Sequence, residues 1–441
     1  MPLKCYKIKE IGQVVGGGTP STTNQDYYGG TIPWLSPKDL SGYNRRYISH
    51  GEKNITELGL ANSGAKMMPA GSILMSSRAP IGYLAIAAND LCTNQGFKSI
   101  VPDTSIVDSE FLYYYLKYHI EEIKGLGVGT TFAEISGRVL ENYEVILPDL
   151  EAQKRISYML SRMDSKIEHN QLINDNLSKQ LECRYYNLYD SFGVDPVETM
   201  SGEYPDGWHL ESVKDYCIDM KNGATPSRSK EEFWIDGEIP WVVTGEVNNS
   251  IILDTAERIT ESGLNNSSAK ILPVDSVVMA MYGRGTAARL ASLKIEATTN
   301  QACCGMICSS PNRSAFLYET LHQMQDQVDS LASGSVQQNL NKEIIGNLKF
   351  VCPPDDMIEK INFIQTIDLM TVNKKQMMKL TRIRDCLLPK LMSGEIDVSN
   401  PDLPTKYSFG RLSGYVLLMG VLHILLIYHG IVKRCIDPYV P

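Results

Sequence analysis

The sequence predicts an α+β protein of two similar domains, each followed by a long helix. Three observations predict this fold class. A segment of roughly two hundred residues occurs twice. Each copy mixes short β-rich apolar runs with turn clusters, and the apolar residues after each copy recur at alternating steps of four and three.

The repeat is visible in phrases that keep their order in both copies. "TPS" at Thr19 and "IPW" at Ile32 return at Thr225 and Ile239, and "TNQ" at Thr93 returns at Thr299. The longest match is "ITELGLANSGAKMMPAGSILM" with "ITESGLNNSSAKILPVDSVVM". A period of this length is too long for a solenoid and indicates a duplicated domain. We therefore expect domains at residues 1–150 and 194–354, with a clear helix in "SEFLYYYLKYHIEEIKG" of the first copy.

Heptad spacing follows each copy, over residues 151–193 and 355–396. The predicted seam is Ile156, Leu160, Met163, Ile167, Asn170, Asn174, Leu177, Leu181 and Leu188 in the first helix, and Met370, Asn373, Met377, Leu380, Leu387 and Leu391 in the second. Asparagine within a seam commonly fixes register and partner. The sequence thus favours an antiparallel coiled-coil spacer roughly 60 Å long; the alternative is that each helix packs only on its own domain.

The composition restricts the classes of function. The 441 residues carry 43% hydrophobic and 21% charged residues, as a soluble globular protein does. A net charge of -9 argues against indiscriminate nucleic-acid binding, so any DNA contact must come from local basic loops. The ten cysteines are scattered and no secretory signal begins the chain, so we expect a reduced, cytoplasmic protein. We expect the Cys303, Cys304 and Cys308 group to be buried side chains, and no metal site.

Three stretches imitate catalytic or ligand-binding sites. Gly16, Gly17 and Gly18 resemble a phosphate loop, but the lysine is missing and the second copy has Asn222, Gly223 and Ala224. "DPY" at Asp437 resembles part of an amino-methyltransferase element but lacks its second proline. The third imitation consists of Asp103, Glu122 and Lys124, which match the carboxylate and lysine set of many metal-dependent nucleases. We interpret all three as structural or coincidental.

Polar and basic loops differ between the copies while the scaffold phrases are kept. Arginine, lysine, asparagine and glutamine suit contacts with bases and phosphates. The candidate DNA-binding residues are Lys38, Arg45, Arg46, Arg78 and Gln95 in the first copy, and Arg228, Lys230, Arg284, Arg289 and Gln301 in the second. Different loops on one scaffold would read two different short sequences.

With these phrases, the chain resembles the specificity subunit of type I restriction-modification systems. The resemblance covers about residues 1 to 400 and includes "SSRAPIG", "TNQGF" and the closing "LLPKLMSGEIDVS". It implies two target-recognition domains that bind the halves of a split, asymmetric site in double-stranded DNA, with the helices setting the gap. It also implies that the chain is non-catalytic and binds two modification subunits and ATP-dependent restriction subunits. S-adenosylmethionine, ATP and magnesium would then be held by these partners, and no cofactor by this chain.

The resemblance ends in a tail at residues 397–441. Residues 412–432 are uncharged and flanked by basic residues, so they are long enough to span a bilayer. We expect no membrane association, because an anchor on a DNA-recognition subunit has no mechanical purpose. Two other classes stay open: a self-sufficient nuclease or methyltransferase, and a duplicated protein-binding scaffold with no DNA role.

Overall fold

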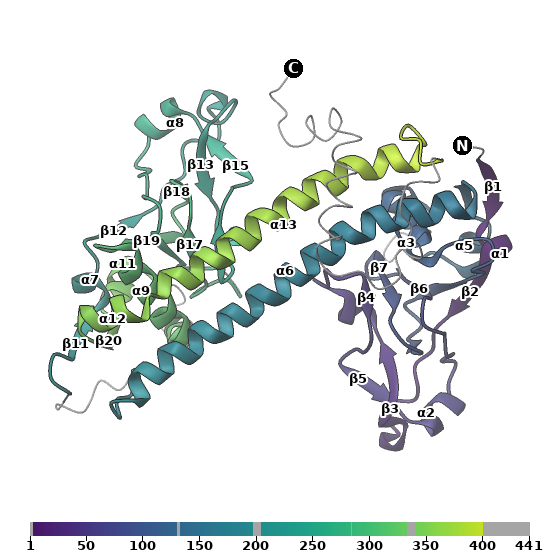
Figure 1. The fold of residues 1–441 in the computed structure, drawn as a ribbon, viewed down its shortest axis with the longest axis horizontal. Helices are drawn as coiled ribbons and strands as arrows, with labels where there is room; N and C mark the ends of the chain where they lie inside the picture. Colours follow the sequence, from purple (N-terminus) through teal and green to yellow (C-terminus); the bar gives the residue numbers. More distant parts are fainter. Residues whose placement is uncertain (1–2, 130–132, 197–203, 284, 333–339, 400–441) are drawn as a thin grey trace. The chain divides into compact units, whose positions relative to one another are not determined.

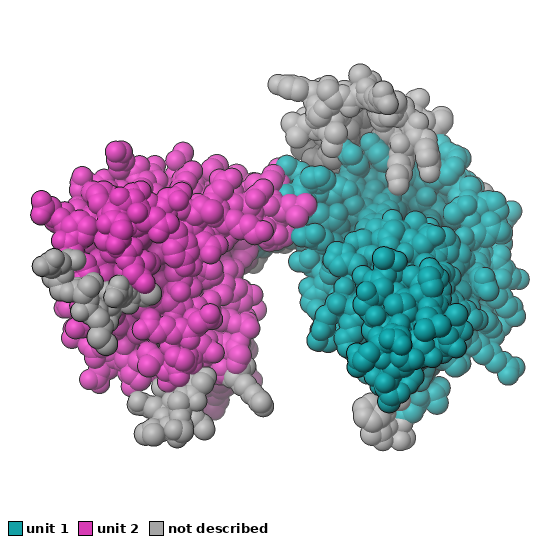
Figure 2. All heavy atoms as spheres, turned by 90° about the horizontal axis from the view of Figure 1, so that it is seen from below, with its two compact units in different colours: residues 1–169, 377–441 teal, residues 170–376 magenta. Residues whose placement is uncertain are grey.

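The chain forms two compact units in a computed structural model that describes residues 3–129, 133–196, 204–283, 285–332 and 340–399 (Figures 1 and 2). Unit 1 comprises residues up to 169 together with those from 377 onward, and unit 2 comprises residues 170–376. Both boundaries fall inside long helices, α6 (Leu150–Asp190) and α13 (Phe363–Met392). Each long helix therefore contributes to both units.

The described part of unit 1 contains a five-stranded sheet of order β2-β9-β6-β7-β4, a three-stranded sheet β5-β3-β8 and the pair β1-β10. The pairs β3/β8 and β4/β7 are parallel, and the others are antiparallel. The strands are β1 (Lys4–Lys7), β2 (Gly12–Gly16), β3 (Tyr28–Leu35), β4 (Tyr47–Ile48), β5 (Lys53–Ile55), β6 (Ile73–Ser77), β7 (Ile81–Ala87), β8 (Cys92–Thr93), β9 (Lys98–Pro102) and β10 (Glu144–Leu147).

The shorter helices of unit 1 pack beside these sheets. They are α1 (Ile8–Ile11), η1 (Gln25–Tyr27), η2 (Pro37–Leu40), α2 (Glu57–Ala61), α3 (Ser109–Tyr118), α4 (Ile120–Gly125) and α5 (Gly137–Glu141). The Asp108 carboxylate begins α3 by accepting a hydrogen bond from the Phe111 amide, 2.9 Å away. The helix predicted over 109–125 is present but divides at His119 into α3 and α4.

Unit 2 repeats the topology of unit 1 strand by strand. Its sheets have the orders β12-β19-β16-β17-β14, β15-β13-β18 and β11-β20, and β13/β18 and β14/β17 are its parallel pairs. The strands are β11 (His209–Ser212), β12 (Asp219–Asn222), β13 (Ile239–Val242), β14 (Ser250–Ile252), β15 (Glu257–Ile259), β16 (Val277–Ala280), β17 (Leu290–Leu293), β18 (Thr298–Thr299), β19 (Cys303–Ile307) and β20 (Lys349–Cys352). The duplicated fold predicted from the repeat is confirmed.

The helices of unit 2 follow the same sequence of elements. They are α7 (Val213–Tyr216), η3 (Glu231–Phe233), η4 (Thr244–Glu246), α8 (Glu261–Asn265), α9 (Pro311–Gln323), α10 (Gln325–Ala332), α11 (Lys342–Gly346) and α12 (Asp355–Ile361). Thr260 begins α8 as Thr56 begins α2, each hydroxyl accepting a hydrogen bond from a glycine amide 3.1 Å away. The shared phrase "IT" thus marks a helix start in both copies.

The first long helix is continuous, whereas the second is interrupted. The 41 residues of α6 run without a break. The second predicted helix, over 355–396, is instead the short α12 followed by the 30 residues of α13. Asn362 lies between them in the left-handed conformation, with φ 54°, which asparagine adopts more readily than most residues.

Within unit 1, both long helices pack against the core of the first domain. Ile156, Leu160 and Met163 of α6 belong to one buried cluster with Ile383, Leu387 and Leu391 of α13 and with side chains of α3. A short ion pair joins Asp164 of α6 to Arg384 of α13.

Within unit 2, the two helices contact each other through their asparagines. The amide of Asn170 donates to Gln376 over 2.7 Å, and the amide of Asn373 donates to Asn174 over 2.8 Å. Asn174 also donates to the Met370 carbonyl over 3.1 Å. Because α6 numbering rises as α13 numbering falls along these contacts, the helices are antiparallel here.

The same segments of unit 2 also join the core of the second domain. Leu181, Tyr185 and Leu188 of α6 lie in one buried cluster with Phe363 and Ile367 of α13. The remaining seam residues, Ile167, Leu177, Met370, Met377 and Leu380, are half-buried. The helices therefore contact each other and also pack on a domain core, so packing on a domain alone does not describe them.

The predicted hydrophobic segment 412–432 lies outside the described residues. Among residues 3–399, with the gaps given above, no helix is long and apolar enough to cross a membrane.

Candidate nucleic-acid interface

The repeated turn in each domain is fastened to the "TNQ" phrase by equivalent hydrogen bonds. The Thr19 hydroxyl donates to the side-chain oxygen of Gln95, and Thr225 does the same to Gln301. Both glutamines are exposed, and each amide NH₂ group has no other partner among the described residues, so it is available to donate. The structure thus places these two candidates at corresponding positions of the two domains.

In each domain a buried tryptophan donates a hydrogen bond to the backbone of the turn. The indole of Trp34 donates to the Gly18 carbonyl over 2.9 Å, and the indole of Trp241 donates to the Ala224 carbonyl over 3.0 Å. A Cβ at Gly17 would lie 2.0 Å from the Asn94 carbonyl oxygen, and a Cβ at Gly223 would meet Asn300 at the same distance. The glycine kept in both copies is therefore required by close backbone packing, which agrees with the structural interpretation of this loop.

Three basic candidates of the first domain are at least partly exposed: Lys38 on η2, Arg45 just before β4, and Arg78 on the β6–β7 hairpin. Lys38 is exposed and pairs with Glu52 over 2.9 Å, and Arg45 is also exposed. Arg78 is partly exposed and lies 3.4 Å from Glu134. An ion pair between an exposed cation and a single carboxylate contributes little to stability, so the cation can readily leave the carboxylate for a phosphate or a base.

The fourth basic candidate of this domain, Arg46, has a different environment. Its side chain is only 6% exposed and lies 3.0 Å from Glu110 of α3 and 3.3 Å from Glu168 of α6. Burial by itself would lower the pKa of its guanidinium, but Tyr114, Glu168 and Glu110 raise the pKa by more, so the group stays charged. Since its donors are engaged inside unit 1, we do not include Arg46 in the proposed DNA surface.

A further cation lies beside Arg78 that the sequence did not single out. Lys98 at the start of β9 is 3.4 Å from the same Glu134 carboxylate. The adjacent cavity of about 520 Å³ is lined by Lys124 and by residues 79–83 of the hairpin. Lys98 follows "TNQGF" directly, but the sequence alone does not show that β9 lies beside the hairpin.

In the second domain, Arg228 and Lys230 lie on aromatic rings. The Arg228 guanidinium is 3.6 Å from the Trp234 ring centre and 4.8 Å from that of Trp241, and it forms a short ion pair with Glu257. The Lys230 ammonium is 4.8 Å from the Phe233 ring centre. These contacts keep both cations close to the repeated turn.

Arg289 is the remaining described candidate among the cations of this domain. It is half-buried immediately before β17, and its side chain forms no hydrogen bond or ion pair with the described residues. Arg284 lies outside the described residues, so its placement is not part of the comparison.

The residues that imitate a nuclease site are engaged with separate local partners. Asp103 accepts hydrogen bonds from the Ser105 hydroxyl and amide, which lower the pKa of its carboxyl. Glu122 pairs with His119 over 3.0 Å, and Lys124 pairs with Glu121 over 2.7 Å. The contacts of these side chains do not unite them into one site. Asp437 lies outside the described residues.

The three cysteines expected in the interior are buried, with Cys303 and Cys304 fully inaccessible. The group of potential metal ligands found among the described residues consists of His209, Glu211 and Cys352, and it includes none of these three cysteines.

The structure thus has two domains of one topology that present different polar and basic side chains around the same turn. The chain belongs to the family described as "Type I restriction modification DNA specificity domain", whose model matches residues 2–179 and 205–379. A DNA-specificity role follows from this membership, and the family implies that the role is non-catalytic.

The chain is similar to two curated proteins over most of their length. It is 33% identical over 407 residues to the type I restriction enzyme MjaIX specificity subunit of Methanocaldococcus jannaschii, covering 89% of this chain and 93% of that protein. It is 24% identical over 435 residues to the HindI specificity subunit of Haemophilus influenzae, covering 80% and 92%.

A solved structure shares the fold. The S subunit of a type I restriction-modification system from M. genitalium matches with a TM-score of 0.57 and 17% identity, covering 89% of this chain and 96% of that one.

Proposed function

We propose that the chain binds a two-part DNA site, with the first domain contacting one half and the second domain the other. The observation that carries the proposal is the pair of domains with the same ten-strand topology but different cations around the same turn. Both domains have an edge-on aromatic pair beside the turn, Tyr28 with Trp34 and Trp234 with Trp241. In the second domain Arg228 lies over this pair, whereas the first domain has Thr22 at the equivalent position. Different side chains at one structural position favour different base sequences.

Lys38, Arg45, Arg78 and Gln95 would contact the first half-site, and Arg228, Lys230, Arg284, Arg289 and Gln301 the second. Glutamine and arginine provide bidentate contacts to base edges, and lysine provides phosphate contacts. With few candidate cations in each domain and a net charge of -9, partner subunits that surround the duplex would supply additional positive surface.

The long helices would set the distance between the half-sites and hold the partners. A continuous α6 of 41 residues corresponds to about 60 Å of helix. In unit 2 this helix exposes Leu172 and Ile173, and α13 exposes Leu369 and Val372, with 45–63% of each residue accessible. Apolar side chains exposed on a helix support its use as a docking surface, here for two modification subunits.

On this proposal, the S-adenosylmethionine chemistry lies in the modification subunits, and ATP-dependent translocation and magnesium-dependent cleavage lie in the restriction subunits. Incubating the purified chain with DNA, magnesium and S-adenosylmethionine, alone and with a modification subunit, tests this division. Methylation or cleavage by the chain alone would favour a self-sufficient enzyme.

The recognition role is tested by mapping modified sites genome-wide in cells that express the chain with its modification subunit. Arg289→Ala should relax or weaken recognition at one half-site, and Arg78→Ala should do so at the other, each by about 1–3 kcal/mol for a lost base contact. Arg138→Ala on α5 serves as an exposed control and should leave both half-sites intact. If each variant altered both halves together, the assignment of one half to each domain would be wrong.

A further inference from the structure

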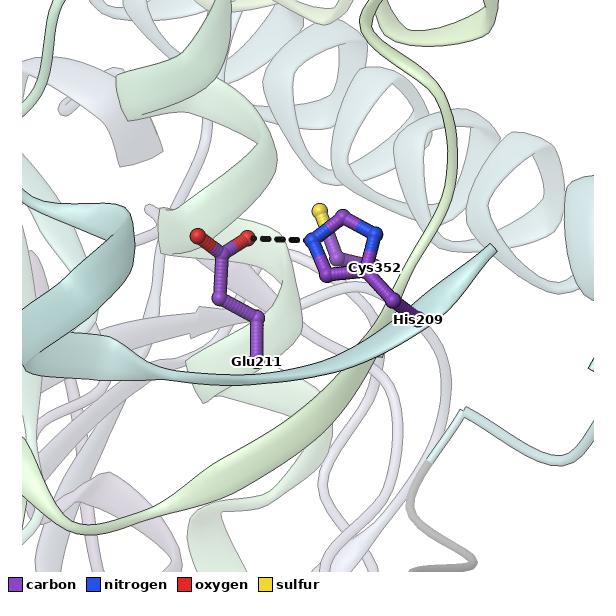
Figure 3. A group of neighbouring side chains, drawn as sticks. All are labelled: His209, Glu211 and Cys352. Carbon is purple, nitrogen blue, oxygen red and sulfur yellow. Dashed lines mark ion pairs between the residues drawn. The ribbon is translucent and has the colours of Figure 1, made fainter. Parts of the chain in front are cut away.

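A histidine, a glutamate and a cysteine meet where the second domain begins and ends. His209 and Glu211 lie on β11, the first strand of this domain, and Cys352 lies at the end of β20, its last strand. Their potential ligand atoms all lie within 4.8 Å of one another. Figure 3 shows the imidazole facing the Glu211 carboxylate, with the Cys352 sulfur beside the ring. This cluster lies outside the proposed DNA surface.

The backbone explains why these three side chains converge. His209 and Cys352 are directly opposite each other in the antiparallel register of β11 and β20. Glu211 is two residues farther along β11, so it points to the same face of the pair. The positions are thus fixed by the strand pairing.

The same positions in the first domain carry no comparable group. The registers of the two strand pairs place Lys4, Tyr6 and Leu147 where the second domain has His209, Glu211 and Cys352. The strand pair therefore forms without ligating side chains, and the scaffold does not require them. Their presence in the second domain needs a separate explanation.

We propose that His209, Glu211 and Cys352 bind a zinc ion that fastens β11 to β20. Imidazole nitrogen, carboxylate oxygen and thiolate sulfur are the usual ligands of zinc, and a water molecule would complete a four-coordinate site. His209 Nε2 lies 3.4 Å from a Glu211 oxygen. Two ligands with bonds of about 2.0 Å to a tetrahedral ion are separated by roughly 3.3 Å, so this pair already has a suitable spacing.

The surroundings allow the remaining adjustment. The side chain of His209 is 58% exposed and can move toward the sulfur, whereas that of Glu211 is 16% exposed and Cys352 is buried. Arg313, the cation near this cluster, is engaged with Asp355 and lies 3.8 Å from the Tyr216 ring centre. A site with one mobile and two fixed ligands can close around an ion without a backbone change.

The test uses the full chain, purified with reducing agent and then titrated with zinc or cobalt(II). We expect one zinc ion per chain to survive dialysis, and cobalt(II) to give a thiolate-to-metal charge-transfer absorption. Cys352→Ser should abolish that absorption, and His209→Ala should weaken zinc binding by at least about tenfold. Cys183→Ser, at an exposed position on α6, and His50→Ala, in the first domain, are the matched controls and should retain full binding.

Thermal unfolding provides a second measurement that does not depend on the absorption. Zinc in excess should raise the Tm of the parent chain by about 5 °C and raise that of the His209→Ala variant by clearly less. Because His209 is exposed, this variant should fold. Equal zinc retention by the parent and Cys352→Ser, or an equal Tm rise in the parent and His209→Ala, would overturn the proposal. DNA recognition does not enter either measurement.

Discussion

Lengthening both long helices by the same seven residues should change the gap between the two halves of the DNA site without changing either half. The variant duplicates residues 170–176 in α6 and residues 370–376 in α13. These segments contain the contacts Asn170–Gln376 and Asn174–Asn373. Because the helices are antiparallel, the two copies of the α6 segment lie opposite the two copies of the α13 segment. The asparagine contacts are therefore present in both copies.

The magnitude follows from helix geometry. Seven residues at 1.5 Å each add about 10.5 Å and preserve the heptad phase. With DNA rising 3.4 Å per base pair, the gap can grow by at most about three base pairs, and by fewer where the helices are inclined to the duplex. The added base pairs also rotate the second half-site about the DNA axis, so reduced or lost modification is the other outcome consistent with a spacer.

The assay is genome-wide mapping of methylated sites in cells that express the variant with its modification subunit. Duplicating only residues 170–176 is the control, and it should impair folding or assembly, because α13 then has no matching segment. Full modification with the gap unchanged would refute the spacer, and so would new half-site sequences. The latter result would mean that the helices take part in reading the bases.

Three further predictions concern stability, each measured by urea unfolding of the full chain. Arg46→Met should lower the free energy of unfolding by roughly 3 kcal/mol, because it leaves Glu110 without its cation in a largely buried site. The control Arg45→Ala should change it by less than about 0.5 kcal/mol. If Arg46→Met left stability unchanged but abolished DNA binding, Arg46 would belong to the DNA surface after all. Gly17→Ala should lose roughly 3 kcal/mol through its 2.0 Å clash, and Gly16→Ala, whose Cβ meets nothing closer than 4.0 Å, should be tolerated. Burial raises the pKa of Glu319 from 4.5 to about 7, so its neutral form favours folding, and that contribution is lost as the pH rises through 7. Glu319→Gln should therefore be more stable than the parent at pH 8, by up to about 3 kcal/mol, with a smaller gain at pH 5. An equal gain at both pH values would show that the charge on Glu319 does not destabilise the folded chain.

The outlines of the fold were predictable because they depend on local pattern and on repetition. The duplication placed corresponding strands and caps, such as Thr56 and Thr260, in both domains. It also identified the glycine loop as scaffold, since a phosphate loop would have kept its glycines. The interruption at Asn362 and the division at His119 were missed, because single-residue backbone conformations are not visible in a hydrophobic period.

The candidate interface was predictable only in part. Exposed candidates such as Lys38, Arg45 and Gln95 have the accessibility that a DNA contact needs. Arg46 does not, although it is adjacent to Arg45 in a loop that looks uniformly basic. Both arginines lie just before β4, and only the fold shows that the second of them meets Glu110 of α3 and Glu168 of α6 while the first stays exposed.

By itself, the sequence determined that the chain is duplicated, that each copy is α+β and that a heptad helix follows each copy, since periodicity and repetition are properties of the chain. Only the tertiary structure decided which distant residues meet. It assigned the second half of α6 to the unit of the second domain, engaged Arg46 with Glu110 and Glu168, and brought His209 and Glu211 to Cys352. The physical reason is that such contacts join residues far apart in the chain through strand pairing and core packing, which no local pattern records.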